Sequence, residues 1–343
     1  MRILWVGGGT GGHLTPALGL AEAMEKRGHR CLFLVNGRDV EKNYFEGHRE
    51  YRSLGVDRGK LPKWLALAKA CCHARRIARE FKPDLVIGLG GAGSLPALFA
   101  KRRSPLALLE GNLVFGRAVR LMKPFAKVLL TQFSQTAASS NKAVAVGPIP
   151  RKLSQHMEKA DACRHFGLDP QKPVLVMTGG SQGARQVNQF LAKQCEQLVE
   201  ANMQVLALVG PGNAEGFSIP QTPMVQVLEH CDAMGAAWSA ADFALCRGGA
   251  STLGEIWLHA VPAAIIPYPG HKDRQQEHNA KALGPGVMVL DMGNPQLAQQ
   301  NFWKVLFDQE RRHQMATHLR STQPQNGLQK AVEVLEEIGG AKA

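Results

Sequence analysis

A glycine-rich loop that ends in a histidine is the first segment whose residues could do chemistry. The run Gly7 to Gly12 (GGGTGG) follows a short apolar stretch, Ile3 to Val6, and His13 comes directly after it, where a helical pattern begins. Backbone N–H groups at the start of a helix hold anions such as phosphates. An imidazole suits proton transfer near neutral pH. We therefore expect an anion-binding turn with a candidate general base beside it.

The same glycines also satisfy the dinucleotide-binding pattern G-x-G-x-x-G, which is weak as a lone motif. A dinucleotide site requires an acidic residue at the end of the second strand to bind the ribose hydroxyls. This chain has Asn36 at that position, with Asp39 three residues later. A bare strand-to-helix turn would explain the glycines but not His13. The sequence therefore disfavours a dinucleotide site.

A second glycine loop has the same setting. Gly179 to Ala184 (GGSQGA) follows the apolar run Val174 to Met177, and a helix is expected from about Arg185. Ser181 offers a hydroxyl that could donate to a phosphate or cap the helix. One such loop is common, whereas two that face each other are specific for a phosphorylated ligand.

A third segment, Cys246 to Glu255 (CRGGASTLGE), again passes from a strand through glycines into a helix. It puts Glu255 about one turn inside the helix, where a carboxylate can accept from the two hydroxyls of a ribose. The segment His271 to Gln276 (HKDRQQ) is expected on a loop, and the amides of Gln275 and Gln276 suit sugar hydroxyls. Without the neighbouring loops, ordinary solvated polar residues would explain this segment equally well.

Alternating strands and helices must position these residues. Short apolar strand patterns recur between helical patterns, which implies parallel sheets joined by right-handed crossovers. The expected strands are Ile3 to Val6, Cys31 to Val35, Pro83 to Leu89, Leu106 to Leu109, Lys127 to Thr131, Val174 to Met177, Val205 to Val209 and Phe243 to Cys246. The predicted fold class is α/β, with two Rossmann-like doubly wound domains.

A link that contains two prolines and a glycine, Val146 to Arg151 (VGPIPR), separates the two expected domains. Its position predicts a first domain over residues 1–149 and a second over residues 150–326. A terminal helix at about 327–343 is a candidate to pack back on the first domain. Ligands of such sheets bind at the carboxyl ends of the strands, so we expect the site in a cleft between the two sheets.

Charge is distributed unevenly along the chain. Residues 1–150 hold 24 Lys and Arg against 10 Asp and Glu, and residues 151–343 hold 17 against 18, which gives +14 and −1. The basic half points to an anionic partner: a nucleic acid, a phospholipid surface or a phosphorylated substrate.

The seven cysteines show no ligand-like spacing, and neither a signal peptide nor an apolar run of about 20 residues is evident. The expected protein is neither secreted nor transmembrane.

Four segments resemble the signature motifs of the MurG family: GGGTGGHLTPAL, VLVMTGGSQGARQVNQ, CRGGASTLGEI and IPYPGHKDRQQEHNA. They lie in the family's order across nearly the whole chain. The resemblance implies a GT-B architecture and an inverting transfer of N-acetylglucosamine from UDP-N-acetylglucosamine to the undecaprenyl-pyrophosphoryl-muramyl-pentapeptide. This is the step from lipid I to lipid II in peptidoglycan synthesis.

The family's motifs, carried over by position, also imply a role for each matching residue. His13 would be the catalytic base. Substrate contacts are implied for Thr10, Gly11, Gly12, Asn112, Arg151, Ser181, Cys231, Ala250, Ser251, Thr252, Leu253, Gly254, Glu255, Gln275 and Gln276. Arg151 and Ser181 would neutralise the pyrophosphate, and Cys231 would read the uracil through its backbone. No DxD-type metal pair is evident, so no tightly bound cofactor is expected, and a divalent-cation requirement for turnover stays open.

Three positions depart from the family's pattern. Leu109 stands where the family usually has a histidine, Ala92 where it has a tyrosine and Gly248 where it has a serine. Two alternatives therefore stay open. One is a UDP-sugar transferase of the same fold that acts on another lipid or small-molecule acceptor, and the other is a catalytically inactive sugar-nucleotide-binding module, which His13 opposes. Nucleic acid is not an expected partner, because no reading helix or aromatic platform is recognisable.

The segment Leu61 to Glu80 is the candidate for membrane contact. It has a helical pattern, carries Trp64 on an apolar side and has Arg75, Arg76 and Arg79 among its cations. A basic amphipathic helix with an interfacial tryptophan favours an anionic membrane surface. The alternative is a helix packed on its own domain with a solvated basic face. The expected location is peripheral, at the cytoplasmic face of the inner membrane.

Overall fold

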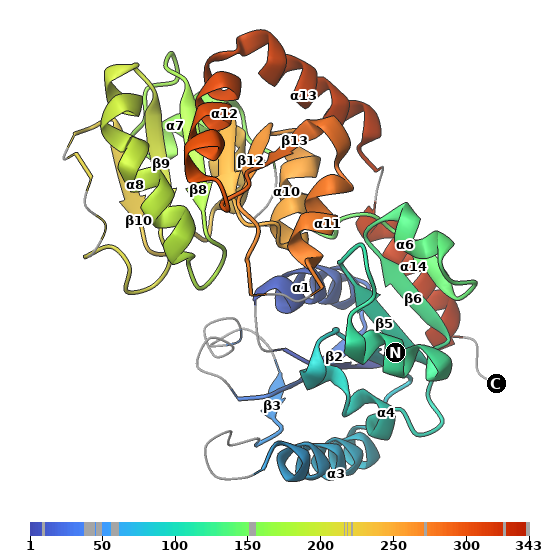
Figure 1. Ribbon diagram of the computed structural model, residues 1–343. Helices are drawn as coiled ribbons and strands as arrows, with labels where there is room; N and C mark the ends of the chain where they lie inside the picture. The colour runs from blue at the N-terminus through green and yellow to red at the C-terminus, as the bar shows by residue number, and fades with distance from the viewer. Residues whose placement is uncertain are drawn as a thin grey trace. The chain divides into compact units, whose positions relative to one another are not determined.

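The computed structural model (Figure 1) describes residues 1–8, 11–37, 45, 50–55, 62–150, 156–215, 217, 219–220, 222–270, 273–324 and 327–340. The chain divides into two compact units: residues 1–151 together with 324–343, and residues 152–323. Each unit is built on one parallel sheet. The predicted α/β fold with two Rossmann-like sheets is confirmed.

The first unit holds seven strands in the order β3-β2-β1-β4-β5-β6-β7. They are β1 (Arg2–Val6), β2 (Arg30–Val35), β3 (Tyr51–Ser53), β4 (Leu85–Gly88), β5 (Leu106–Glu110), β6 (Val128–Thr131) and β7 (Ala143–Ala145). In the register, Leu4 of β1 is opposite both Leu32 of β2 and Val86 of β4. The strand order reverses between β1 and β4, and ligands of such sheets bind at the carboxyl ends beside this reversal.

Helices cover both faces of the first sheet. They are α1 (Gly11–Lys26), α3 (Lys63–Phe81), α4 (Ala97–Ala100), α5 (Arg117–Met122), α6 (Ser134–Ala138) and α14 (Gly327–Gly340), with 3₁₀ turns η1 (Ala92–Ser94) and η2 (Lys123–Phe125). Trp5 packs in one core with Leu14 of α1 and Leu335 of α14, whereas Leu4 packs in another core with Ile77 of α3. Successive side chains of a strand point to opposite faces, so β1 feeds both cores.

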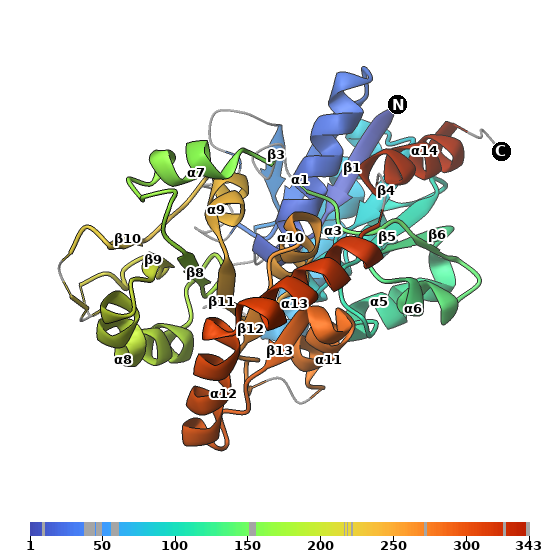
Figure 2. The ribbon, with the colours of Figure 1, turned by 90° about the horizontal axis from the view of Figure 1, so that it is seen from above.

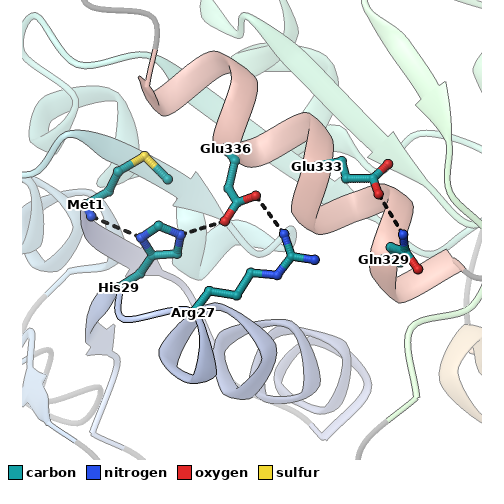
Figure 3. Close-up of polar contacts among 6 residues, drawn as sticks. All are labelled: Met1, Arg27, His29, Gln329, Glu333 and Glu336. Carbon is teal, nitrogen blue, oxygen red and sulfur yellow. Dashed lines mark hydrogen bonds and ion pairs between the residues drawn. The ribbon is translucent and has the colours of Figure 1, made fainter.

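Polar contacts fix α14 to the beginning of the chain, as Figure 3 shows. Glu336 accepts hydrogen bonds from Arg27 Nη1 and from His29 Nε2, each at 2.8 Å. The other ring nitrogen of His29 lies 3.0 Å from the amino group of Met1. The hydrogen bond from His29 and the charge of Arg27 hold the pKa of Glu336 below its usual range. The last helix therefore belongs to the same unit as the first strand.

The second unit has six strands in the order β10-β9-β8-β11-β12-β13. The strands are β8 (Val174–Thr178), β9 (Gln204–Leu208), β10 (Val225–Leu228), β11 (Phe243–Cys246), β12 (Ala263–Ile265) and β13 (Val287–Val289). The helices are α7 (Lys159–His165), α8 (Arg185–Glu200), α9 (Met234–Ala240), α10 (Ala250–His259), α11 (Gln275–Lys281), α12 (Pro295–Phe307) and α13 (Gln309–Thr322). Helix α13 lies beside α10 (Figure 2). The strand order reverses between β8 and β11, as it does between β1 and β4.

Several short strands were not expected from the sequence, namely β3, β7, β10, β12 and β13. β3, β7, β12 and β13 have only three residues each, which is too short for a strand pattern to stand out, and three of the four residues of β10 are only half-buried. Within the part of the chain that the structure describes, none of the helices combines the length and the apolar character that crossing a bilayer requires.

Candidate active site

The candidate base His13 lies in the first turn of α1, next to the loop that follows β4. Gly90 and Gly91 of that loop have φ values of +82° and +66°, which residues with a Cβ rarely adopt. A Cβ on Gly91 would stand 3.1 Å from His13 Nε2, and a Cβ on Gly90 would stand 3.3 Å from Nδ1. The two glycines therefore form the turn and also leave room for the imidazole ring.

The surroundings of His13 favour its neutral form. Burial lowers the pKa of His13, and a hydrogen bond to the carbonyl of Leu89 acts in the opposite direction with a smaller effect. A neutral imidazole has one N–H donor and one nitrogen that accepts a proton. With its N–H donated to the carbonyl of Leu89, the neutral ring keeps the lone pair of its other nitrogen, which is the atom that can accept a proton. His13 as a whole residue is half-buried.

Asn112, a predicted sugar contact, is held by a buried carboxylate at the end of β5. Glu110 Oε1 accepts from the backbone N and from Nδ2 of Asn112, at 3.0 and 2.8 Å, and Oε2 accepts from the backbone N of Gly116 at 2.8 Å. Burial raises the pKa of Glu110, while these three hydrogen bonds act to lower it. Sequence reasoning did not select Glu110. The available signal was a carboxylate at the end of an apolar strand, two residues before a polar candidate.

The second glycine loop, Gly179 to Ala184, turns tightly between β8 and α8. A Cβ on Gly179 would stand 2.2 Å from the backbone N of Ala184, so only glycine fits there. Helix α8 has Ala184 at its N-cap with no side-chain cap hydrogen bond. The capping role considered for Ser181 is therefore wrong. Ser181 is exposed on the loop, which leaves its hydroxyl accessible to a ligand.

The third loop leads into α10, which begins at Ala250. Glu255 lies in the second turn of α10, and its Oε2 accepts a 2.9 Å hydrogen bond from the indole Nε1 of Trp238. Trp238 is buried in α9, so it fixes the carboxylate from the core side. The predicted contacts Ala250, Ser251 and Thr252 are half-buried, whereas Leu253 and Gly254 are buried. The side chain of Leu253 lies in the core, which leaves only its backbone for ligand contact.

Cys231, the predicted uracil contact, belongs to the same part of the second unit as Glu255. Burial raises the pKa of the Cys231 thiol, and the charge of Glu255 adds to this effect. Cys246, at the end of β11, also has its thiol pKa raised by burial, with Glu255 again contributing. Glu255 thus lies within electrostatic range of both thiols, which groups the predicted uracil and ribose contacts.

The two glutamines predicted to bind the sugar open a helix. The expectation of a loop is wrong for them, since α11 spans Gln275–Lys281 with Arg274 as its N-cap. Gln276 Oε1 accepts a 2.8 Å hydrogen bond from the backbone N of Tyr268, which fixes its amide. Both glutamines are half-buried. A helix start explains the polar sequence here as well as a loop would, which is why composition did not distinguish them.

Some predicted residues are not described. Thr10 and Arg151 lie outside the described residues, as do His271 and Lys272. Gly11 opens α1, and Gly12 is exposed in the same turn.

The three departures from the family's pattern fall in different surroundings. Leu109 is buried in the core on the α1 side of the first sheet, and Ala92 is exposed at the start of η1. Gly248 lies in the second unit, between β11 and α10.

Among the described residues, no group of three or more His, Cys, Asp or Glu side chains is arranged to hold a metal ion.

Comparisons with known proteins cover both units. The model of the glycosyltransferase family 28 N-terminal domain matches residues 3–131, and that of the family 28 C-terminal domain matches residues 174–322. A Nocardioides protein named "UDP-N-acetylglucosamine--N-acetylmuramyl-(pentapeptide) pyrophosphoryl-undecaprenol N-acetylglucosamine transferase" is 34% identical over 314 residues, 85% of each chain. A protein of the same name from Acetivibrio thermocellus is 28% identical and aligns over 100% of both chains. The crystal structure of Acinetobacter baumannii MurG has a TM-score of 0.77 at 25% identity, covering 98% of this chain and 99% of that one.

These matches define the class of the protein as a two-domain α/β glycosyltransferase. The chain belongs to glycosyltransferase family 28, and within it to the MurG group. The predicted resemblance and the predicted enzyme class, a hexosyltransferase, are both confirmed.

Proposed function

We propose that the protein transfers N-acetylglucosamine from UDP-N-acetylglucosamine to N-acetylmuramyl-(pentapeptide) pyrophosphoryl-undecaprenol, with inversion at the anomeric carbon. The observation that carries this proposal is the similarity, across both units, to relatives that bear this name, at 34% identity over 85% of the chain for one of them. The local geometry supports it, because each unit offers residues suited to one half of the reaction.

The second unit binds the UDP part of the donor. Helices α8 and α10 both start at glycine loops, and their N-termini carry partial positive charge that stabilises a diphosphate. The exposed hydroxyl of Ser181 adds a donor to the diphosphate, and Arg151, which is the last residue of the first unit before the second begins, adds a cation. Glu255, held by Trp238, accepts from the ribose hydroxyls. The backbone of Cys231 reads the uracil.

The transferred sugar is held by amide side chains. Gln275 and Gln276 at the start of α11 bind its hydroxyls, and Asn112 is the further candidate contact to the sugar. Thr10, Gly11 and Gly12, which directly precede His13 in the sequence, contact the donor. Gln276 and Asn112 each have one polar group fixed by a neighbour, which reduces the entropy lost when the sugar binds.

The first unit supplies the base for the transfer step. The neutral ring of His13 takes the proton from the acceptor hydroxyl as its oxygen forms a bond to the anomeric carbon. The bond between that carbon and the β-phosphate oxygen breaks, and UDP leaves with the electron pair. Positive ends of helices and the donors of the second unit stabilise the charge that develops on UDP. The reaction is therefore a single displacement, which inverts the configuration.

Peripheral attachment to an anionic membrane surface is the second part of the proposal. On α3, Trp64 is 71% exposed, and Leu65 and Leu67 are exposed beside it. Arg75 and Arg79 are exposed farther along the same helix. Apolar side chains at one end and cations at the other match the interface between lipid tails and anionic headgroups. This arrangement would bring the first unit to the lipid acceptor.

Transfer of labelled N-acetylglucosamine from its UDP conjugate to a short-chain analogue of the lipid acceptor tests the proposal. Wild-type protein is expected to form the disaccharide lipid with inverted configuration. A parallel panel of other lipid and small-molecule acceptors tests the alternative acceptor, which the departures at Leu109 and Ala92 motivate. Transfer to a panel member with none to the muramyl lipid would reject the proposed acceptor. Donor binding without transfer to any acceptor would indicate an inactive binding module instead.

A further inference from the structure

The backbone of Gly248 lies directly against the first turn of α11. A Cβ built on Gly248 would stand 2.2 Å from the carbonyl oxygen of Gln276, 2.8 Å from its carbonyl carbon and 2.9 Å from its Cβ. Two of these three atoms belong to the main chain, so rotation of a side chain cannot relieve the overlap. Any side chain at position 248 would therefore displace either the loop or the helix.

Hydrogen bonds hold this contact from the helix side. Asn279, fully buried one turn after Gln276, donates from Nδ2 to the carbonyl of Gly248 at 3.2 Å. Gln276 Oε1 accepts from the backbone N of Tyr268 at 2.8 Å. The start of α11 is thus tied both to the end of β11 and to the segment that follows β12.

The neighbouring arginine ties the same segments from the strand side. Arg247 Nη1 donates to the carbonyls of Ile266 and Pro267, at 3.0 and 2.9 Å. Its guanidinium also lies 5.6 Å from the centre of the Tyr268 ring. Arg247 is buried, so these contacts replace the water that the cation has lost. Arg247 therefore anchors the loop beside Gly248 to the segment that follows β12, whereas α11 is held to Gly248 by the hydrogen bond from Asn279, so we expect a Cβ at Gly248 to shift α11 and not the loop.

We infer that Gly248 is a specificity-determining position, which sets how closely Gln275 and Gln276 approach the transferred sugar. The inference rests on the proposed function in one respect, the role of these two amides. Hydrogen bonds weaken steeply outside a narrow range of distance and angle, so displacing the start of α11 weakens contacts to the sugar and spares those to the nucleotide. The serine that the family usually has at this position does not fit the arrangement seen in this chain.

Calorimetric titration of Gly248→Ala and Gly248→Ser with UDP, UDP-N-acetylglucosamine and its C4 epimer tests the inference. We expect the Kd for UDP to stay within about twofold, while the Kd for UDP-N-acetylglucosamine rises by about fivefold to tenfold, the loss of roughly one hydrogen bond. The ratio of the Kd for the C4 epimer to the Kd for UDP-N-acetylglucosamine should fall by a similar factor. Gly340→Ala, in α14 of the first unit, is the matched control, because a Cβ there also meets no atom within 4 Å and the residue is not in any of the proposed binding loops.

Two results would overturn the inference: equal weakening of UDP and UDP-N-acetylglucosamine, or no change in either. If the Gly248 variants fail to fold, Asn279→Ala loosens the same contact without adding volume, and it should reduce the sugar preference in the same direction. Unaltered sugar preference in a folded Asn279→Ala protein would also overturn it. If selective loss of sugar binding is seen while wild-type protein transfers to no acceptor, the inference stands and the proposed transfer fails.

Discussion

The β1-to-α1 and β11-to-α10 junctions use the same local design for different purposes. Both pass from a buried parallel strand through glycines into a helix, so both present backbone N–H groups at the carboxyl edge of a sheet. The first junction adds His13, whose neutral ring suits a base, and belongs to a half with a charge of +14. The second adds Glu255, fixed by a buried tryptophan, and belongs to a half with a charge of −1. The side chains after the glycines, not the turn itself, determine the chemistry.

Removing the base from the first junction should have the largest effect. His13→Ala is expected to lower kcat by about 100-fold to 10,000-fold, the range for a general base. The Kd for UDP should stay within about twofold, because His13 is not among the proposed nucleotide contacts. The measurement is transfer to the lipid acceptor alongside nucleotide calorimetry, with exposed His313→Ala as the control. Near-normal kcat in His13→Ala would contradict the division of roles.

Reversing charge in the basic half should weaken membrane binding more than the same change in the neutral half. Arg75→Glu with Arg79→Glu in α3 is expected to reduce partition onto anionic liposomes by about tenfold or more, from roughly 1 kcal/mol per cation near the surface. The matched control reverses the exposed Arg311 and Arg320 of α13 and should change little. Flotation assays at two salt concentrations measure both. Equal binding by the two double variants would reject α3 as the contact.

The pH dependence should follow the first junction. Because burial lowers the pKa of His13 below its ordinary value of 6.5, the base stays neutral at and below that pH. We expect kcat/KM to be level near pH 7 and to fall by about tenfold per unit once pH drops below the lowered pKa. The folded state also binds fewer protons at this residue than the unfolded state, so acid should reduce stability through the same group. An acid limb that persists unchanged in His13→Ala would assign it to another residue.

Changing the carboxylate of the second junction should affect nucleotide affinity most. Glu255→Gln keeps an oxygen that can accept the hydrogen bond from the indole of Trp238. It removes the negative charge of the group proposed to accept hydrogen bonds from the ribose hydroxyls. The Kd for UDP is expected to rise by about fivefold to tenfold, with a smaller rise for 2′-deoxy-UDP. Comparing the two ligands by calorimetry separates a ribose contact from a general disturbance. An equal loss for both would contradict the role given to Glu255.

The sequence predicted the strand–glycine–helix junctions, because burial and turn formation depend on residues close together in the chain. Other parts of the site follow no local pattern. Glu110, which holds Asn112, was not selected, and Gln275 and Gln276 were expected on a loop although they open α11. Short strands such as β3 and β12 form because longer neighbours align them in the sheet, not because their own residues show a period.

The sequence by itself determined the α/β class, the order of the glycine loops and the candidate base, since each is a matter of residue type and spacing. The tertiary structure alone decided which distant residues meet. His13 lies against Gly90 and Gly91 because β1 and β4 are neighbours at the reversal of strand order. Gly248 meets Gln276 because α11 packs on the end of β11. Such contacts depend on how sheets and helices pack, and packing also excludes the water whose loss lowers the pKa of His13.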